Sequence, residues 1–243
     1  MKDISESDAQ ILEPYYTFSN INLLQQALTH SSWANEHKVK DNERLEFLGD
    51  AILQLLATEA LFQSKEIYNE GKMTAIRQLT VREESLAAAA EDLGLGKALL
   101  LGQGEERTGG REKTSNLADA FEAILAAIYL DAKAQDHCGL DAARKFFYSC
   151  LGPTLEAAKE GKLIYDYKSK LLEWVQSLEE PAPLEFRVLS QEGPAHHPIF
   201  HMAAYIGEQK VAKVKAASKK QAEQKLSKII YEQREAFKKV FEA

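Results

Sequence analysis

The chain has 243 residues, of which 45% are hydrophobic, so it is long enough for one large domain or two modest ones. It contains no apolar run of about 18 residues, and its polar start lacks a signal-peptide pattern; we therefore expect a cytoplasmic protein without a membrane span. The two cysteines, Cys138 and Cys150, are too few for a disulfide framework and lack metal-ligand spacing.

The formal net charge of −7 is distributed unevenly. Residues 1–162 carry 17 basic and 26 acidic side chains, whereas residues 163–243 carry 13 and 11. Seven lysines fall within residues 210–228, with Glu223 as the single acid. The overall sign argues against nucleic acid as a partner, but local placement decides electrostatic binding, so the lysine-rich segment is compatible with a polyanion.

The first half predicts an all-helical domain. Amphipathic or largely apolar stretches with helical period lie at 20–29, 43–63, 74–92, 116–130 and 139–149. Polar or glycine-rich breaks, such as 94–96 and 102–114, separate some of these stretches, and no stretch alternates as a strand would. The segment 152–166 breaks the helical pattern and is expected to serve as a linker.

The second half predicts a small α-β-β-β-α domain. Residues 168–178 form an amphipathic helix, which the prolines of 181–183 terminate. Three partly alternating segments follow, with a turn before the last; they are 184–190, 199–206 and 210–216. A final helix starts near Ser218, a plausible N-cap. This order is typical of a three-stranded antiparallel sheet with two helices on one face.

Three acidic side chains share one face of the helix predicted at 43–63. Glu43, Glu46 and Asp50 follow each other at i, i+3 and i+7 among apolar residues. No lysine or arginine stands three or four residues from Glu46 or Asp50. Taken alone, such acids are most simply a solvated helix face.

The helix predicted at 116–130 repeats this pattern with Asp119 and Glu122, again without a local cation. Like charges at this spacing cost roughly 0.2–0.5 kcal/mol per pair, and burial raises that cost. Two such helices are explained if they pack together and hold a cation between them. Carboxylates without thiolates or clustered imidazoles favour hard ions, so we expect Mg²⁺ first and Mn²⁺ as a substitute.

The acidic segments resemble the motifs of the ribonuclease III family. NERLEFLGDAIL (42–53) is similar to the family's signature, and LADAFEAILAAIYLD (117–131) to its second acidic motif. ALTHSSWANE (27–36) and TAIRQLTVREESLAAAAEDLGLG (74–96) extend the resemblance. It implies a metal-dependent endonuclease that hydrolyses double-stranded RNA, leaves 5′-phosphate and 3′-hydroxyl ends with short 3′ overhangs, and processes ribosomal and messenger RNA precursors. No organic cofactor is expected.

The same resemblance implies roles for individual residues. It implies that four carboxylates hold metal ions or their waters: Glu46, Asp50, Asp119 and Glu122. Of these, Asp50 and Glu122 would also be catalytic. Glu43 and Asn116 have supporting roles, although helix capping or solvent contact is equally open for Asn116. The implied homodimer brings one active centre to each RNA strand. Phe47 matches a position that inserts into the partner, with burial in its own chain as the alternative.

The second half resembles a double-stranded RNA-binding domain in LLEWVQS (171–177), GPAHHPIF (193–200) and ASKKQAEQ (217–224). The implied RNA-binding residues are Glu173, Gln176, His196, Ser218, Lys219 and Lys220. Lysines at a helix N-terminus add their charge to the helix dipole, which favours phosphate; a solubilising lysine surface is the alternative. Two departures, a glycine-poor approach to Ser218 and Glu223 in place of a common lysine, predict weaker or altered phosphate contact.

The expected architecture is therefore mainly α: an all-helical catalytic domain followed by a small α+β RNA-binding domain. The expected boundaries are 1–155 for the catalytic domain, 156–165 for a linker, 166–234 for the RNA-binding domain and 235–243 for a helical tail. Two rivals differ in function. One is a non-enzymatic RNA-binding protein on a degenerate nuclease scaffold, which the presence of all four acids disfavours. The other is a helical carboxylate–metal enzyme acting on nucleotides, which would not need a duplex-binding module.

Overall fold

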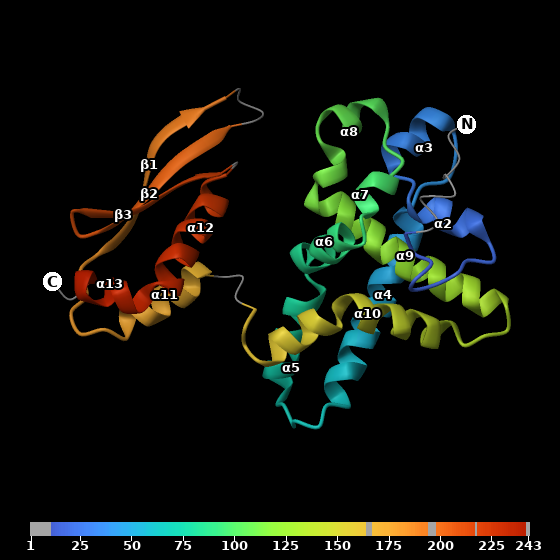
Figure 1. The fold of residues 1–243 in the computed structure, drawn as a ribbon, viewed down its shortest axis with the longest axis horizontal. Coiled ribbons are helices and arrows are strands. Elements are labelled where there is room, and N and C mark those ends of the chain that lie inside the picture. The colour runs from blue at the N-terminus through green and yellow to red at the C-terminus, as the bar shows by residue number, and fades with distance from the viewer. Residues whose placement is uncertain (1–10, 164–166, 194–197, 217, 242–243) are drawn as a thin grey trace. The chain divides into compact units, whose positions relative to one another are not determined.

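The computed structural model describes residues 11–163, 167–193, 198–216 and 218–241. The chain divides into two compact units, Met1–Leu163 and Ile164–Ala243. Helices make up the first unit, and the second combines a small sheet with helices (Figure 1). The predicted fold class, mainly α with a C-terminal α+β part, is confirmed. Among the described helices, none combines the length and hydropathy that a membrane span requires.

The described part of the first unit contains helices and one isolated parallel bridge, between Thr29 and Leu100. Its helices are α2 (Ile21–Ala27), α3 (Ser31–His37), α4 (Glu43–Phe62), α5 (Glu70–Val81), α6 (Glu83–Asp92), α7 (Leu95–Ala98), α8 (Gln103–Arg107), the 3-10 turn η1 (Gly110–Glu112), α9 (Thr114–Ala134) and α10 (Gly139–Lys159).

Helix α9 is the centre of the first unit. It packs against α4, α6, α10 and α2, and most of its side chains are buried. A helix that is apolar around most of its circumference is stable in water only when neighbours cover it, so the hydrophobic composition of this segment places it in the core. Two acidic side chains on this helix, Asp119 and Glu122, are only partly buried.

The prediction of a single helix at 74–92 is wrong, because two helices, α5 and α6, occupy this segment. Arg82 adopts an extended conformation (φ −72°, ψ 156°) and separates α5 from α6. The hydroxyl of Ser85 donates to the carbonyl of Leu79 at 2.8 Å, which bridges the break. The break allows α5 to pack against α4 and α10 while α6 packs against α9, and periodicity alone does not reveal this division of neighbours.

The break predicted at 94–96 overlaps the start of α7, and the break predicted at 102–114 contains α8 and η1. Arg111 connects them, because its Nη1 donates to the carbonyls of Gly96, Lys97 and Leu99 at 2.9, 3.1 and 2.9 Å. Glycines and polar side chains suggest loops locally, but this tertiary hydrogen bonding orders the segment.

The linker predicted from residue 152 begins inside α10, so that boundary is wrong. Leu151, Leu155 and Ala158 continue the apolar spacing at i, i+4 and i+7, and all three are buried. Pro153 removes one backbone hydrogen bond, yet the buried face carries the helix on to Lys159. The domain boundary predicted at 155 therefore also falls within a helix.

The second unit has the predicted α-β-β-β-α order plus one more helix. Its elements are α11 (Tyr167–Gln176), β1 (Leu184–Glu192), β2 (Ile199–Ile206), β3 (Gln209–Ala216), α12 (Lys219–Glu232) and α13 (Arg234–Phe241). The strands form an antiparallel sheet in the order β1-β2-β3, with a register shift between Val188 and Ser190. Its covered face carries Met202 and Ala204, which lie in one core with Leu171 of α11 and Leu226 of α12.

Helix α13 belongs to the core of the second unit. Phe241 is fully buried, and its ring meets that of Trp174 edge to face at a centroid distance of 5.5 Å. The carbonyl of Phe241 also accepts a hydrogen bond from the backbone N–H of Ala182 at 2.8 Å. The segment predicted as a helical tail is helical, but it is packed against α11.

Candidate active site and RNA-binding face

The backbones of helices α4 and α9 lie in close contact at Gly49. A Cβ atom added there would lie 1.9 Å from the carbonyl oxygen of Glu122. Since no side chain fits in that space, glycine is what allows the two backbones to cross here. The crossing point lies between Glu46 and Asp50 on one helix and at Glu122 on the other, so it brings the predicted acids of both helices together.

Glu122 has the most perturbed carboxyl of this group. Partial burial and, in decreasing order, the charges of Asp50, Glu46 and Asp119 together raise its pKa to about 8. Burial disfavours the carboxylate form, and three neighbouring negative charges act in the same direction. All four predicted acids are thus electrostatic neighbours in the structure.

Two of the other acids show the same effect. Burial raises the pKa of Glu46, with the charges of Asp119, Glu43 and further acids adding to it. Burial also raises the pKa of Asp119, followed by the charge of Glu83, while His30 and Lys113 oppose the rise. A cluster of acids held partly out of water is the arrangement expected where a cation belongs.

Asp50 is more exposed than the other three acids, and its Oδ1 accepts a hydrogen bond from Nε2 of Gln54 at 3.2 Å. In the described part of the chain, no three His, Cys, Asp or Glu side chains already converge as ligands. The four side chains would therefore have to turn toward an ion. Their donor set, carboxylate oxygen alone, suits a hard divalent cation such as Mg²⁺.

The side chain of Asn116 is buried and makes two hydrogen bonds that were not predicted from the sequence. Its Nδ2 donates to Oε1 of Glu105 at 2.9 Å and to the carbonyl of Gly110 at 3.0 Å. Lys113 Nζ lies 3.3 Å from the same Glu105 oxygen. The hydrogen bond from Asn116 is the main cause that lowers the pKa of Glu105. The solvent-contact alternative for Asn116 is thus wrong, and the residue ties α8 and η1 to the start of α9.

Sequence reasoning missed the residues that surround the acids. Glu83, His30 and Lys113 act on Asp119, and Asp41 acts on Glu46. They come from separate loops and helix ends, so no periodicity links them to the acidic helices. His30 and Glu83 lie in the segments 27–36 and 74–96. The family resemblance of these segments was the sequence feature that could have indicated that His30 and Glu83 lie near the acids.

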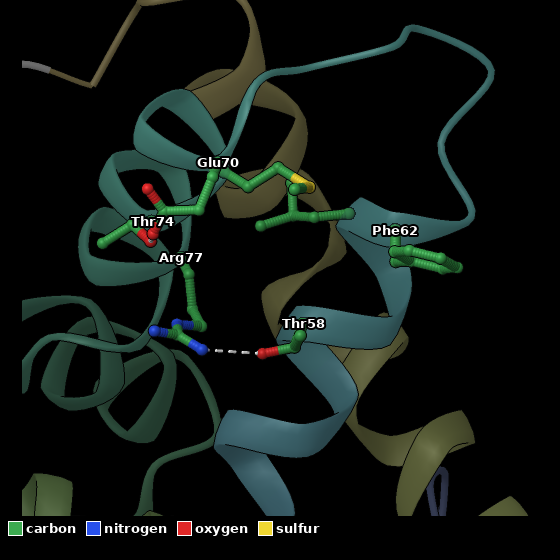
Figure 2. Close-up of a pocket in the computed structure, with 7 residues that line it drawn as sticks. Thr58, Phe62, Glu70, Thr74 and Arg77 are labelled. Carbon is green, nitrogen blue, oxygen red and sulfur yellow. Dashed lines mark hydrogen bonds between the residues drawn. The ribbon is translucent and has the colours of Figure 1, made fainter.

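Phe47 is 83% exposed, so the alternative that it fills its own chain's core is wrong. Leu55 and Phe62 are 51% and 80% exposed and follow it along the same side of α4. Next to Phe62, a cavity of about 210 Å³ opens between α4 and α5. Arg77 of α5 reaches across it to donate to Thr58 Oγ1 at 3.0 Å (Figure 2).

In the second unit, the structure places most of the predicted RNA-binding residues at the surface. Ser218 caps α12, because its Oγ accepts a hydrogen bond from the N–H of Gln221 at 3.2 Å. Lys219 and Lys220 follow it and are exposed. On α11, Glu173 and Gln176 are exposed, and Glu173 pairs with Lys170 at 2.9 Å. His196 lies outside the described residues.

Comparison with known proteins bears on both units. Residues 20–153 match the family model Ribonuclease-III-like, and residues 167–233 match Double-stranded RNA binding motif. The chain is 42% identical over 218 residues to Ribonuclease 3 of Streptococcus gordonii, covering 88% of this chain and 90% of that protein. It is 41% identical over 227 residues to Ribonuclease 3 of Desulforamulus reducens, covering 92% and 89%.

A solved structure agrees with these matches. The nuclease domain of ribonuclease III from Campylobacter jejuni is 40% identical and superposes with a TM-score of 0.54, over 61% of this chain and 96% of that one. It is described for structural flexibility in the region involved in dimer formation. The family model covers more than half of the chain, and the relatives match it over most of their length. The chain therefore belongs to the ribonuclease III family of endoribonucleases, with a nuclease unit followed by a double-stranded RNA-binding motif.

Proposed function

We propose that this chain cleaves both strands of duplex RNA by hydrolysis that depends on Mg²⁺, or on Mn²⁺ as a substitute. The observation that carries the proposal is the group of four acids at the α4–α9 crossing, in which burial and three neighbouring charges raise the pKa of Glu122 to about 8. Such a group is costly for the fold by itself, and a bound divalent ion compensates that cost.

Glu46, Asp50, Asp119 and Glu122 would hold the ions or their waters, and Asp50 and Glu122 lie closest to the chemistry in this proposal. When bound there, Mg²⁺ would supply a water of lowered pKa and would neutralise charge on the phosphate. Water would add to phosphorus and give up a proton while the bond to the 3′-oxygen breaks and that oxygen takes up a proton, which leaves 5′-phosphate and 3′-hydroxyl ends. Glu122 has to lose its proton before it can hold a cation, so loading is favoured by rising pH.

We further propose a two-fold homodimer built on α4. Phe47, Leu55 and Phe62 form an exposed apolar stripe, with Leu55 near its middle. If two copies of α4 pack antiparallel about that middle, Phe47 of each copy meets the Phe62 end of the other. The cavity of about 210 Å³ at that end has room for an aromatic ring, since about 150 Å³ is enough for benzene.

The second unit supplies duplex recognition in this proposal. Such domains read the shape of A-form RNA through minor-groove contacts and through phosphates at a helix N-terminus. Glu173 and Gln176 are exposed on α11, and Lys219 and Lys220 are exposed at the start of α12.

Two centres in a dimer would cut opposite strands and leave short 3′ overhangs. The substrates that we propose are precursors of ribosomal and messenger RNA, which form hairpins. The compartment that we propose is the reducing cytoplasm, where both thiols stay free.

The test is cleavage and binding of a labelled RNA duplex by wild type and Glu122→Gln. We expect wild type to cut both strands with Mg²⁺ and not with EDTA. Glu122→Gln should bind normally but cut on the order of 100-fold more slowly, because it removes a metal-holding charge that contributes about 3 kcal/mol in the transition state. Glu91→Gln, which neutralises an exposed acid on α6, is the matched control.

Two results would overturn the proposal. Duplex binding by wild type without cutting in Mg²⁺ or Mn²⁺ would support the non-enzymatic rival. Metal-dependent hydrolysis of free nucleotides without RNA cutting would support the nucleotide hydrolase rival.

A further inference from the structure

The start of α12 combines two exposed lysines with an acid on one helical face. Lys219 and Lys220 precede Glu223 by four and three residues, so their side chains project over the same side of the first turns. Phosphate is attracted to this helix end by the two lysines and by the helix dipole. A carboxylate one turn away acts in the opposite direction.

Glu223 forms an ion pair with a lysine at the start of α11. Nζ of Lys168, in the first turn of α11, lies 2.7 Å from Oε2 of Glu223. The backbone N–H of Lys168 also donates to Oε1 of Gln224 at 3.3 Å, which fixes the start of α11 against α12. The two charged side chains are 40% and 27% exposed, so both remain within reach of a bound polyanion.

We propose that Glu223 limits the affinity of the second unit for duplex RNA by neutralising Lys168, a cation that would otherwise bind phosphate together with Lys219 and Lys220. The inference rests on the proposed function, because it requires that phosphates approach the start of α12. Lys168 lies in the first turn of α11 and is paired with Glu223, which stands one helical turn after Lys219 and Lys220. With Glu223 ionised, the Lys168–Glu223 pair contributes no net charge to phosphate binding.

The two single variants change the charge near the bound phosphates in opposite directions. Glu223→Gln frees the ammonium of Lys168 and removes a negative charge near the phosphates, whereas Lys168→Gln leaves that negative charge uncompensated. The double variant has the same net charge as wild type. One added phosphate contact steepens the dependence of log Kd on log salt by about one.

The experiment measures binding of the full-length chain to a labelled RNA duplex at several salt concentrations, in Ca²⁺-free and Mg²⁺-free buffer with EDTA so that cutting does not interfere. At low salt, we expect Glu223→Gln to bind about threefold to tenfold more tightly and Lys168→Gln to bind weaker by a similar factor. The double variant should lie close to wild type, and the gain of Glu223→Gln should shrink as salt rises.

A structural role for the pair would give a different pattern. If the pair only fixes α11 against α12, both single variants should weaken binding, lower the melting temperature and leave the salt slope unchanged. Glu232→Gln is the matched control, because it removes the same charge near the far end of the same helix, where Lys228 lies 3.8 Å away. Equal tightening by Glu232→Gln would show a general charge effect and overturn the proposal.

Lys219→Gln separates this inference from the proposed function. If Lys219→Gln weakens binding and Glu223→Gln does not tighten it, the inference fails while the RNA-binding role of α12 stands. If Lys219→Gln and Lys220→Gln both leave Kd unchanged, the proposed RNA-binding face itself is wrong, and the inference fails with it.

Discussion

Gly49 illustrates how one missing side chain determines the position of the acids. An alanine methyl group there would lie 1.9 Å from the Glu122 carbonyl, in backbone that cannot move aside cheaply. We expect Gly49→Ala to separate α4 from α9, to destabilise the first unit by about 1–3 kcal/mol, as overpacking does, and to abolish cutting. Urea unfolding and duplex cleavage would measure the two effects.

Gly152 is the matched control for this prediction. It also lies within a long helix, but a methyl group added to it would meet nothing within 4 Å. Because alanine restricts the unfolded chain more than glycine does, Gly152→Ala should be neutral or stabilise by about 0.5–1 kcal/mol. A large loss of stability in Gly152→Ala, or none in Gly49→Ala, would contradict the packing argument.

Glu122 predicts a pH-dependent stability in the metal-free protein. Its pKa is about 8 in the fold, above the ordinary value of 4.5, so the native state binds more protons than the unfolded state between these values. Stability should therefore fall as pH rises from about 4.5 to about 8, which is the sign for an acid with a raised pKa. Melting temperatures in EDTA across this range would show it.

Glu122→Gln should flatten that pH profile, because its amide does not titrate. Added Mg²⁺ should raise the melting temperature of wild type most at the alkaline end, where the ion replaces the lost proton. An unchanged profile in Glu122→Gln would mean that other groups determine the pH dependence.

That the acids of the two helices lie together was predictable from the sequence, for a physical reason. Acidic side chains at helical spacing in apolar helices, without lysine or arginine one turn away, carry an uncompensated cost, and that cost is visible in a single helix. The environment of Asn116 was not predictable, because Glu105 and Gly110 reach it through a loop whose conformation depends on tertiary contacts. The same holds for His30 and Glu83 beside Asp119.

At the scale of elements, α13 shows that a terminal helix can be part of a domain core. Phe241 is fully buried against Trp174. We expect Phe241→Ala to destabilise the second unit by about 3–5 kcal/mol, through lost burial and the cavity that remains, and to weaken RNA binding because α11 loses its support. Lys239→Ala, an exposed change on the same helix, should leave both unaffected. Thermal unfolding and duplex binding of these two variants would test whether α13 is a tail or a structural element.

Element boundaries were the least predictable part of the fold. The strand bounds were predicted to within two residues, although burial along β2 does not alternate, since Met202, Ala203 and Ala204 are all buried. The break at Arg82 and the extension of α10 past Pro153 depend on which neighbours each helix meets, and a local pattern does not contain that information.

At the scale of the whole molecule, the apolar stripe on α4 predicts the oligomeric state. Phe47→Glu should convert the proposed dimer to a monomer, because a charge would be buried at the interface, and paired cuts on the two strands should be lost. Sedimentation velocity would measure the mass. Ile21→Glu, at a 46% exposed apolar residue on α2, is the control and should leave the dimer intact. A wild-type monomer at the concentrations used for cleavage would contradict the proposal.

Because α10 continues to Lys159 and Leu163 still packs against the core of the first unit, only residues 164–166 remain before α11. A chain of three residues is at most roughly 10 Å long. A short tether holds the second unit at an effective concentration on the order of millimolar around RNA that the nuclease unit already holds. An RNA-binding unit of modest intrinsic affinity would then stay engaged before cutting and dissociate quickly from the separated products, so a high affinity would slow turnover.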